Sequence, residues 1–280
     1  MKRLAVIFPG IGYTADKPLL HYSRRIAERF GYESHVVPYT GFPKKVKGDA
    51  DKMRKSCEIA LTQAKEVLSD LDLMRCEDVL FIGKSIGTVA AAAIASQHPA
   101  RARIRSVVYT PLEQTFSFAL GDAVVFTGSG DPWVGGEKSR IPALCEKQRV
   151  PCHVIREANH SLETKDPQTD IHNLQKIMEL TADFIRKEQL RRISQYESFL
   201  RELQKMISEA EPSAEELRKG RKTAERLSRY LDSDDWKLDF ADDEKGLLPK
   251  DLPRGVLSED GIYNVLEAFR DLLKMKGVKP

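Results

Sequence analysis

The chain has 280 residues, of which 41% are hydrophobic and 31% are charged, and its formal net charge is +3. This length is sufficient for one large domain with its own core and a second, smaller domain. Because the net charge is small, the composition gives no reason to expect a nucleic-acid partner.

The cysteines and the N-terminal residues argue against a metal-binding, disulfide-stabilised, secreted or membrane protein. Cys57, Cys76, Cys145 and Cys152 have no CxxC spacing, so we expect reduced thiols and neither a metal site nor a disulfide framework. The N-terminal segment MKRLAVIFPG has five apolar residues before Pro9, whereas a secretory signal needs roughly 7–15. No apolar run approaches the roughly 18 residues that cross a membrane. The sequence therefore predicts a cytoplasmic protein with no membrane partner, no cofactor and no metal.

Up to about residue 190, short apolar runs alternate with longer amphipathic ones. Strands are predicted at 3–8, 33–38, 78–83, 104–109, 122–127 and 152–156, and helices at 17–30, 50–71, 86–97, 138–147 and 168–190. Strands this apolar, separated by helices, are typical of a parallel sheet covered on both faces. We therefore expect a three-layer α/β sandwich with a mostly parallel sheet over residues 1–190. Its functional groups should lie on loops at the carboxyl ends of the strands.

Beyond residue 190 the pattern changes. Apolar residues follow helical spacing in three stretches, while residues 232–260 between them are rich in turn-forming and acidic residues. The prediction is a small α-helical C-terminal domain, residues 191–280, with one long structured loop. The acids in this loop lack the spacing of a calcium-binding loop, so they are expected to be solvated. Trp236 should lie in the core of the small domain, and Ser258 should cap its last helix.

Residues 80–95, LFIGKSIGTVAAAAIA, contain two competing motifs. The GKS triplet could end a phosphate-binding loop, and the GKSIG segment could be a nucleophile elbow. A phosphate-binding loop needs a glycine five residues before Gly83, where Asp78 stands, and the four residues between them belong to a predicted strand. The elbow needs a buried strand, a tight turn and a helix that starts at once, and the predicted elements supply all three. We therefore predict that Ser85 is a nucleophile. The alternative is a structural turn with an idle serine.

A nucleophilic serine needs a base, and the base needs an acid that orients it. Of the six histidines, only His160, after the last predicted strand, lies on a loop at the expected edge of the sheet. Asp131, in the turn GSGDPW after the preceding strand, is the candidate acid, and Glu113 is the second candidate. The alternatives are a surface histidine and an aspartate that only forms a turn.

The developing oxyanion needs backbone N–H donors. Ile86, which follows the serine at the start of a predicted helix, should provide one. Ile11, in the loop PGIGYT after the first strand, should provide the other, unless that segment is only a tight turn.

Ser85, Asp131 and His160 occur in the chain order Ser–Asp–His, and with the segments GKSIG, GSGDPW and ANHSLE the sequence resembles the α/β-hydrolase superfamily over residues 3–190. The resemblance implies a catalytic triad of these three residues. The chain begins at what would be the third strand of the family. Only residues 110–121 stand where many members insert a lid, so the site is expected to be shallow and wet. Separately, the segments WKLDF and GVLSED resemble a small bacterial domain family of unknown function over about residues 190–275.

The sequence thus predicts a serine hydrolase of the esterase or thioesterase type, whose partner is a small-molecule ester or thioester. The alternative is a non-catalytic scaffold that binds a protein through its helical tail. Lys44, Lys45 and Lys84, close to the expected site, raise the hypothesis of an anionic substrate. The alternative for these lysines is a solvated basic loop.

Overall fold

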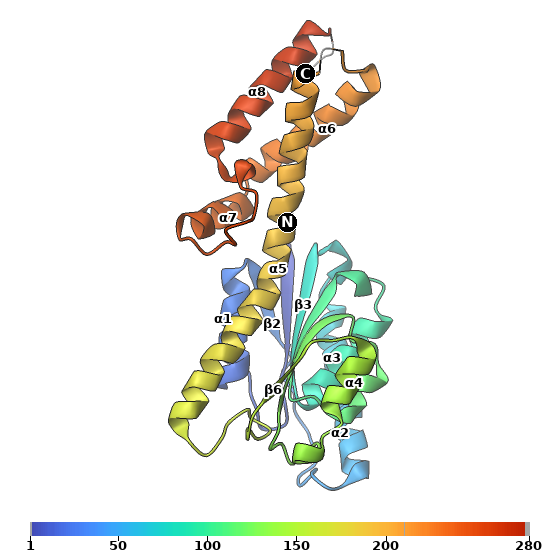
Figure 1. Ribbon diagram of the computed structural model, residues 1–280. Coiled ribbons are helices and arrows are strands. Elements are labelled where there is room, and N and C mark those ends of the chain that lie inside the picture. The colour runs from blue at the N-terminus through green and yellow to red at the C-terminus, as the bar shows by residue number, and fades with distance from the viewer. Residues whose placement is uncertain (1, 210, 278–280) are drawn as a thin grey trace. The chain divides into compact units, whose positions relative to one another are not determined.

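The structure is a computed structural model that describes residues 2–209 and 211–277 (Figure 1). It divides into two units, one up to Ile185 and the other from Arg186. Each unit has a hydrophobic core of its own. The two units are therefore described one after the other.

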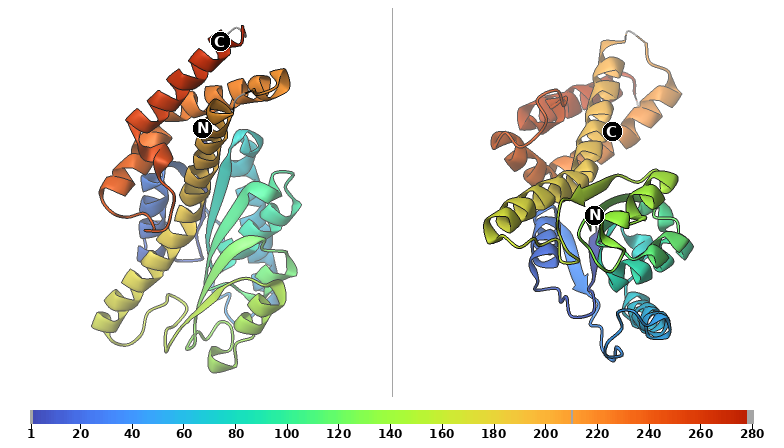
Figure 2. Two further views of the ribbon diagram at one scale, coloured as in Figure 1. Left: turned by 45° about the horizontal axis from the view of Figure 1, so that its top comes forward. Right: turned by 60° about the horizontal axis from the view of Figure 1, so that its bottom comes forward.

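The first unit is a three-layer α/β sandwich around a parallel sheet (Figures 1 and 2). The strand order is β2-β1-β3-β4-β5-β6, with all neighbours parallel. The strands are β1 (Arg3–Phe8), β2 (Tyr32–Val36), β3 (Asp78–Lys84), β4 (Ile104–Tyr109), β5 (Asp122–Gly128) and β6 (Cys152–Ile155). Every predicted strand is present, with bounds within two residues of the prediction, and the predicted fold class is confirmed.

Helices cover both faces of the sheet because alternate strand residues point to opposite sides. In β1, Ala5 and Ile7 join the core under α1 (Pro18–Arg29) and the first part of α5 (Pro167–Ser208). Leu4 and Val6 join the core on the other face, under α2 (Ala50–Ser69) and α3 (Ile86–Gln97). The remaining elements of this unit are α4 (Ile141–Gln148) and the 3-10 helices η1 (Leu73–Arg75), η2 (Arg101–Arg103), η3 (Glu113–Ser117) and η4 (Gly136–Lys138). The helix predicted to end near residue 190 continues to Ser208.

The order of the strands determines where a site can form. From β1 the chain moves outward to β2, and it then returns to β3 on the opposite side of β1. The loops that follow β1 and β3 therefore separate at the carboxyl edge of the sheet, and a crevice between such loops is the usual ligand site of open parallel sheets. The loop with Ile11 and the turn with Ser85 are these two loops.

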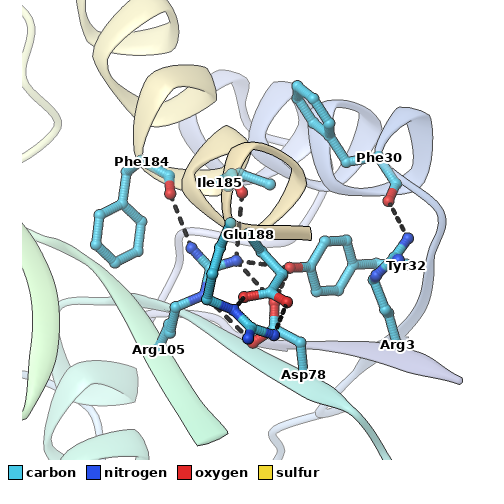
Figure 3. Close-up of polar contacts among 9 residues, drawn as sticks. Arg3, Phe30, Tyr32, Asp78, Arg105, Phe184, Ile185 and Glu188 are labelled. Atoms are coloured by element: carbon cyan, nitrogen blue, oxygen red, sulfur yellow. Dashed lines mark hydrogen bonds and ion pairs between the residues drawn. The ribbon is translucent and has the colours of Figure 1, made fainter. Parts of the chain in front are cut away.

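A buried ionic network lies at the opposite, amino edge of the sheet (Figure 3). The guanidinium of Arg105, on β4, donates to both carboxylate oxygens of Asp78, at the start of β3, at 3.2 and 2.7 Å. It also donates to the Tyr32 hydroxyl at 2.7 Å and to the main-chain oxygens of Phe184 and Ile185 in α5 at 2.8 and 3.3 Å. This single side chain therefore joins three strands and the covering helix.

The second unit consists of the C-terminal part of α5 with α6 (Ala214–Leu231), α7 (Asp234–Glu244), η5 (Gly255–Leu257) and α8 (Glu259–Met275). Trp236 is buried in its core, and its indole N–H donates to the Val256 carbonyl at 3.0 Å. The Ser258 side chain accepts the Gly261 N–H at 3.1 Å and caps α8. These two predictions are confirmed.

The prediction of a solvated acidic loop is wrong, because residues 234–244 form helix α7. Asp239 on α7 has no exposed surface; it accepts hydrogen bonds from Arg192 at 2.6 and 2.9 Å and from the Tyr230 hydroxyl at 2.6 Å. Asp242, also buried, accepts from Gln189. Asp239 and Asp242 are therefore internal partners of polar groups elsewhere in the unit, whereas Asp232, Asp234 and Glu244 are exposed. Within the described residues, no helix combines the length and apolarity that a membrane span requires.

Candidate active site

Ser85 occupies the sharp turn between β3 and α3. Its φ and ψ angles are 54° and −122°, a conformation that non-glycine residues rarely adopt. The turn is fixed by hydrogen bonds from the Ser85 N–H to the Tyr109 carbonyl at 3.0 Å and from the Thr88 hydroxyl to the Ser85 carbonyl at 2.6 Å. A Cβ atom at Gly87 would lie 2.1 Å from the Phe8 carbonyl oxygen, so only glycine allows α3 to approach the end of β1. The local structure is a strand, a sharp turn and a helix that starts at once, which is the arrangement that a nucleophile elbow requires.

Ser85, His160 and Asp131 form a continuous chain of hydrogen bonds. The distance from His160 Nε2 to Ser85 Oγ is 2.7 Å, and the distance from His160 Nδ1 to Asp131 Oδ2 is also 2.7 Å. Asp131 has no exposed surface, whereas 17% of the His160 side chain is exposed. When Nδ1 carries the proton of the neutral imidazole, its N–H donates a hydrogen bond to the carboxylate. Nε2 then has a lone pair that can accept the proton of the serine hydroxyl.

The loops that carry Asp131 and His160 are packed against each other. A Cβ atom at Gly128 would lie 2.1 Å from the Ala158 carbonyl oxygen, so the glycine is required for this close approach. The Asn159 side chain accepts the Ser161 N–H at 2.7 Å, which fixes the turn at His160. Glu113, the second candidate for the acid, lies instead on η3 at 3.4 Å from Arg140.

Trp133 is a further part of the site that the sequence did not assign. Its ring stacks on the His160 ring with a centroid distance of 5.2 Å, and its backbone N–H donates to Asp131 Oδ1 at 2.9 Å. One residue therefore contacts both His160 and Asp131. The only signal in the sequence was its position two residues after Asp131, because stacking on a distant histidine leaves no local pattern.

Lys84 does not face the same side as Ser85. It is almost fully buried, and its Nζ lies 4.9 Å from the centroid of the Tyr13 ring. Burial lowers the pKa of Lys84 to about 7, although the negative charges of Asp131 and Glu163 oppose this shift. The lysine next to the serine in sequence is therefore buried and does not line the pocket that contains Ser85.

The pKa of His160 is lowered from its ordinary value, chiefly by burial. The hydrogen bond that His160 donates to Asp131 acts in the opposite direction, and the positive charge of Lys84 lowers the pKa further. A lowered pKa keeps the imidazole neutral at pH 7, the form that a general base requires.

Above this triad lies a pocket of about 380 Å³. Ile86 is the first residue of α3, so its N–H is one of the helix N-terminal donors that have no carbonyl partner within the helix. The hydrogen bonds between Gly10 and Tyr13 use the N–H groups of these two residues and not that of Ile11. Among the residues that line the pocket are Ile11, Lys44, Lys45, Ser85, Ile86 and His160. In the described parts of the chain, no three His, Cys, Asp or Glu side chains are grouped as metal ligands.

Comparisons with known proteins agree with both resemblances found in the sequence. Residues 193–276 match the model of a family described as a domain of unknown function, DUF4298, and fall on the helical unit. None of the curated proteins matches the chain. The solved structures that resemble the first two-thirds of the chain include several α/β hydrolases.

Three of these structures illustrate the likeness. An α/β serine hydrolase homologue from Coxiella burnetii is 18% identical over 65% of this chain and 84% of its own, with a TM-score of 0.47. An α/β serine hydrolase without a lid from Xanthomonas campestris is 12% identical over 66% and 81%, with a TM-score of 0.49. An esterase from Pyrococcus furiosus is 13% identical over 66% and 82%, with a TM-score of 0.47.

Proposed function

We propose that the protein is a serine hydrolase that cleaves a carboxylic ester or thioester. The observation that carries the proposal is the pair of 2.7 Å contacts joining Ser85 to His160 and His160 to Asp131. The strained backbone at Ser85 supports it, because such conformations persist where the surrounding structure enforces them, often at reactive residues.

In the proposed reaction, Ser85 Oγ attacks the carbonyl carbon while His160 Nε2 takes the hydroxyl proton. Asp131 holds the imidazole and stabilises its charged form. The N–H groups of Ile11 and Ile86 bind the oxyanion of the tetrahedral intermediate. His160 then protonates the leaving alcohol or thiol, and an acyl ester on Ser85 remains. Water attacks this ester, with His160 again as the base, and the carboxylic acid is released.

A fluorophosphonate probe tests the proposal without knowledge of the substrate. The wild-type protein should be labelled, and Ser85→Ala should not be labelled. Ser161→Ala, which removes a neighbouring hydroxyl of no proposed role, is the matched control and should be labelled like the wild type. Labelling that persists in Ser85→Ala would contradict the role of this serine. A wild-type protein that is neither labelled nor able to hydrolyse esters would favour the non-catalytic scaffold instead.

We also propose that residues 1–190 are the hydrolase domain and that residues 191–280 form a separate domain with no part in the chemistry. Every proposed catalytic residue precedes residue 161, and the family match begins at residue 193. A fragment of residues 1–190 should be labelled by the probe, and a fragment of residues 188–280 should lose its helical circular dichroism in one cooperative transition. If the first fragment aggregates or is not labelled, the division is wrong.

A further inference from the structure

A second hollow lies beside the pocket that contains Ser85. It is an open groove of about 540 Å³, formed by the loop before α2 together with α2, α3 and η3. Val46 and Met53 line both the groove and the Ser85 pocket. These two side chains are therefore a shared wall, and the two hollows are neighbours along the surface of the first unit.

The inner surface of the groove is apolar, while its rim is polar. Val89 on α3 and Phe118 after η3 belong to the core that packs under α2, and they face the groove together with Cys57. Gln114 and Ser117, both exposed residues of η3, lie at the rim, and the charged residues Asp49 and Arg54 also line the groove. An apolar hollow with a few polar groups at its edge is typical of a small-molecule site.

One of the two residues of the shared wall, Met53, has a side chain that can change its conformation. Val46 is buried, but Met53 is half-buried, and an unbranched methionine side chain can take several shapes in an irregular gap. A chain attached to a carbonyl at Ser85 could therefore continue past Met53 into the groove.

We propose that this groove binds the apolar chain of a substrate whose ester or thioester carbonyl reacts at Ser85. The proposal rests on the proposed hydrolase function and names its substrate class, which is esters or thioesters with an extended aliphatic chain. Each methylene that leaves water for the groove should raise kcat/KM roughly fourfold. This class differs from the small substrate and shallow site expected from the sequence, because the short segment 110–121 contributes η3 as one side of a groove.

The test compares p-nitrophenyl decanoate with p-nitrophenyl acetate, whose acyl group is too short to leave the Ser85 pocket. The wild type should prefer decanoate in kcat/KM. Gln114→Trp and Ser117→Trp fill the groove from its exposed rim, so they should lower the decanoate-to-acetate ratio roughly fifteenfold, the effect of losing two buried methylenes. Thr62→Trp, at an exposed position of α2 that lines neither hollow, is the matched control and should keep the wild-type ratio.

The outcomes separate this inference from the function on which it rests. Phosphonate labelling and acetate hydrolysis without a preference for decanoate, or a ratio that both rim variants leave unchanged, would overturn the groove alone. Absence of labelling would overturn the hydrolase. A binding measurement covers that second case: calorimetry with sodium decanoate should detect binding to Ser85→Ala, and adding Ser117→Trp should weaken it at least tenfold. Equal binding by the two proteins, or no binding by either, would overturn the groove whether or not the protein is an enzyme.

Discussion

The two edges of the sheet each hold a buried carboxylate with a nitrogen base as its partner. At the amino edge, Asp78 is paired with Arg105, which is always charged and whose remaining donors are taken by a hydroxyl and by carbonyls. At the carboxyl edge, Asp131 is paired with His160, whose second nitrogen reaches a serine in an open pocket. An imidazole changes charge near neutral pH, whereas a guanidinium does not. The two networks share a buried carboxylate and differ in its partner and in the group at the far end. These two differences, rather than the carboxylate, suit one network to holding the structure and the other to the proposed proton transfer.

The largest expected effect comes from breaking the carboxyl-edge network. Asp131→Asn should lower kcat by about 10⁴, because the amide favours the imidazole tautomer with its proton on Nε2. Glu113→Gln, which changes the second candidate acid in the same way, is the control and should have little effect. Steady-state kinetics on any ester that the wild type hydrolyses provides the measurement. A large effect of Glu113→Gln with a small effect of Asp131→Asn would reverse the assignment.

Breaking the amino-edge network should affect stability instead of chemistry. Arg105→Met leaves Asp78 buried without its cation, so the free energy of unfolding should fall by about 3–5 kcal/mol. The double variant Arg105→Met/Asp78→Leu should regain part of this loss, since no charge is then left unpaired. Arg101→Met, at an exposed position nearby, is the control.

Urea unfolding measures the stabilities, and the phosphonate labelling rate below the unfolding transition measures the site. If folded Arg105→Met is labelled much more slowly than the wild type, the two edges are not independent and the comparison fails.

A third variant tests whether the charge of Lys84 affects the pKa of His160 at the carboxyl edge. Lys84→Met removes a positive charge that lowers the pKa of His160, so this pKa should rise. The base must be neutral to act, and the acid limb of the labelling rate should therefore move to higher pH. The pKa of Lys84 is itself lowered to about 7, so its influence should be full below pH 7 and should fade above it.

Proton NMR of the His160 ring measures the pKa directly. The matched control is Lys47→Met, because Lys47 also lowers the pKa of His160 but is the weakest contributor. An unchanged His160 pKa in Lys84→Met would show that the buried amine is not coupled to the triad.

The smallest expected effect concerns the rim of the pocket. Lys44 and Lys45 line the same pocket as Ser85, which keeps the hypothesis of an anionic substrate open, whereas Lys84 is buried and does not line it. Lys44→Ala/Lys45→Ala should lower the preference for a carboxylate-bearing ester over a neutral one about two- to fivefold, the range of exposed ion pairs. Added salt should lower the wild-type preference in the same direction. A ratio that neither change affects would contradict the hypothesis.

The sequence predicted the elements that depend on local patterns. Ser85 could be placed because strand, turn and helix follow one another within a few residues, and Asp131 and His160 because each follows a strand of the same parallel sheet. The sequence could not place Asp239, since its partner Arg192 is 47 residues away and acids in a turn-rich segment resemble solvated ones. Lys84 was expected near the substrate because it is next to Ser85 in the sequence. Adjacent residues at the end of a strand point in different directions, however, and Lys84 is buried.

The backbone angles of Ser85 have a consequence for how this protein can change over time. A serine held at a φ of 54° stores strain of about 1–3 kcal/mol, whereas a glycine adopts positive φ without a steric penalty. The exchange of this serine for glycine would therefore relieve strain in the fold while removing the proposed nucleophile. Stability and the proposed reaction therefore place opposite demands on this one position.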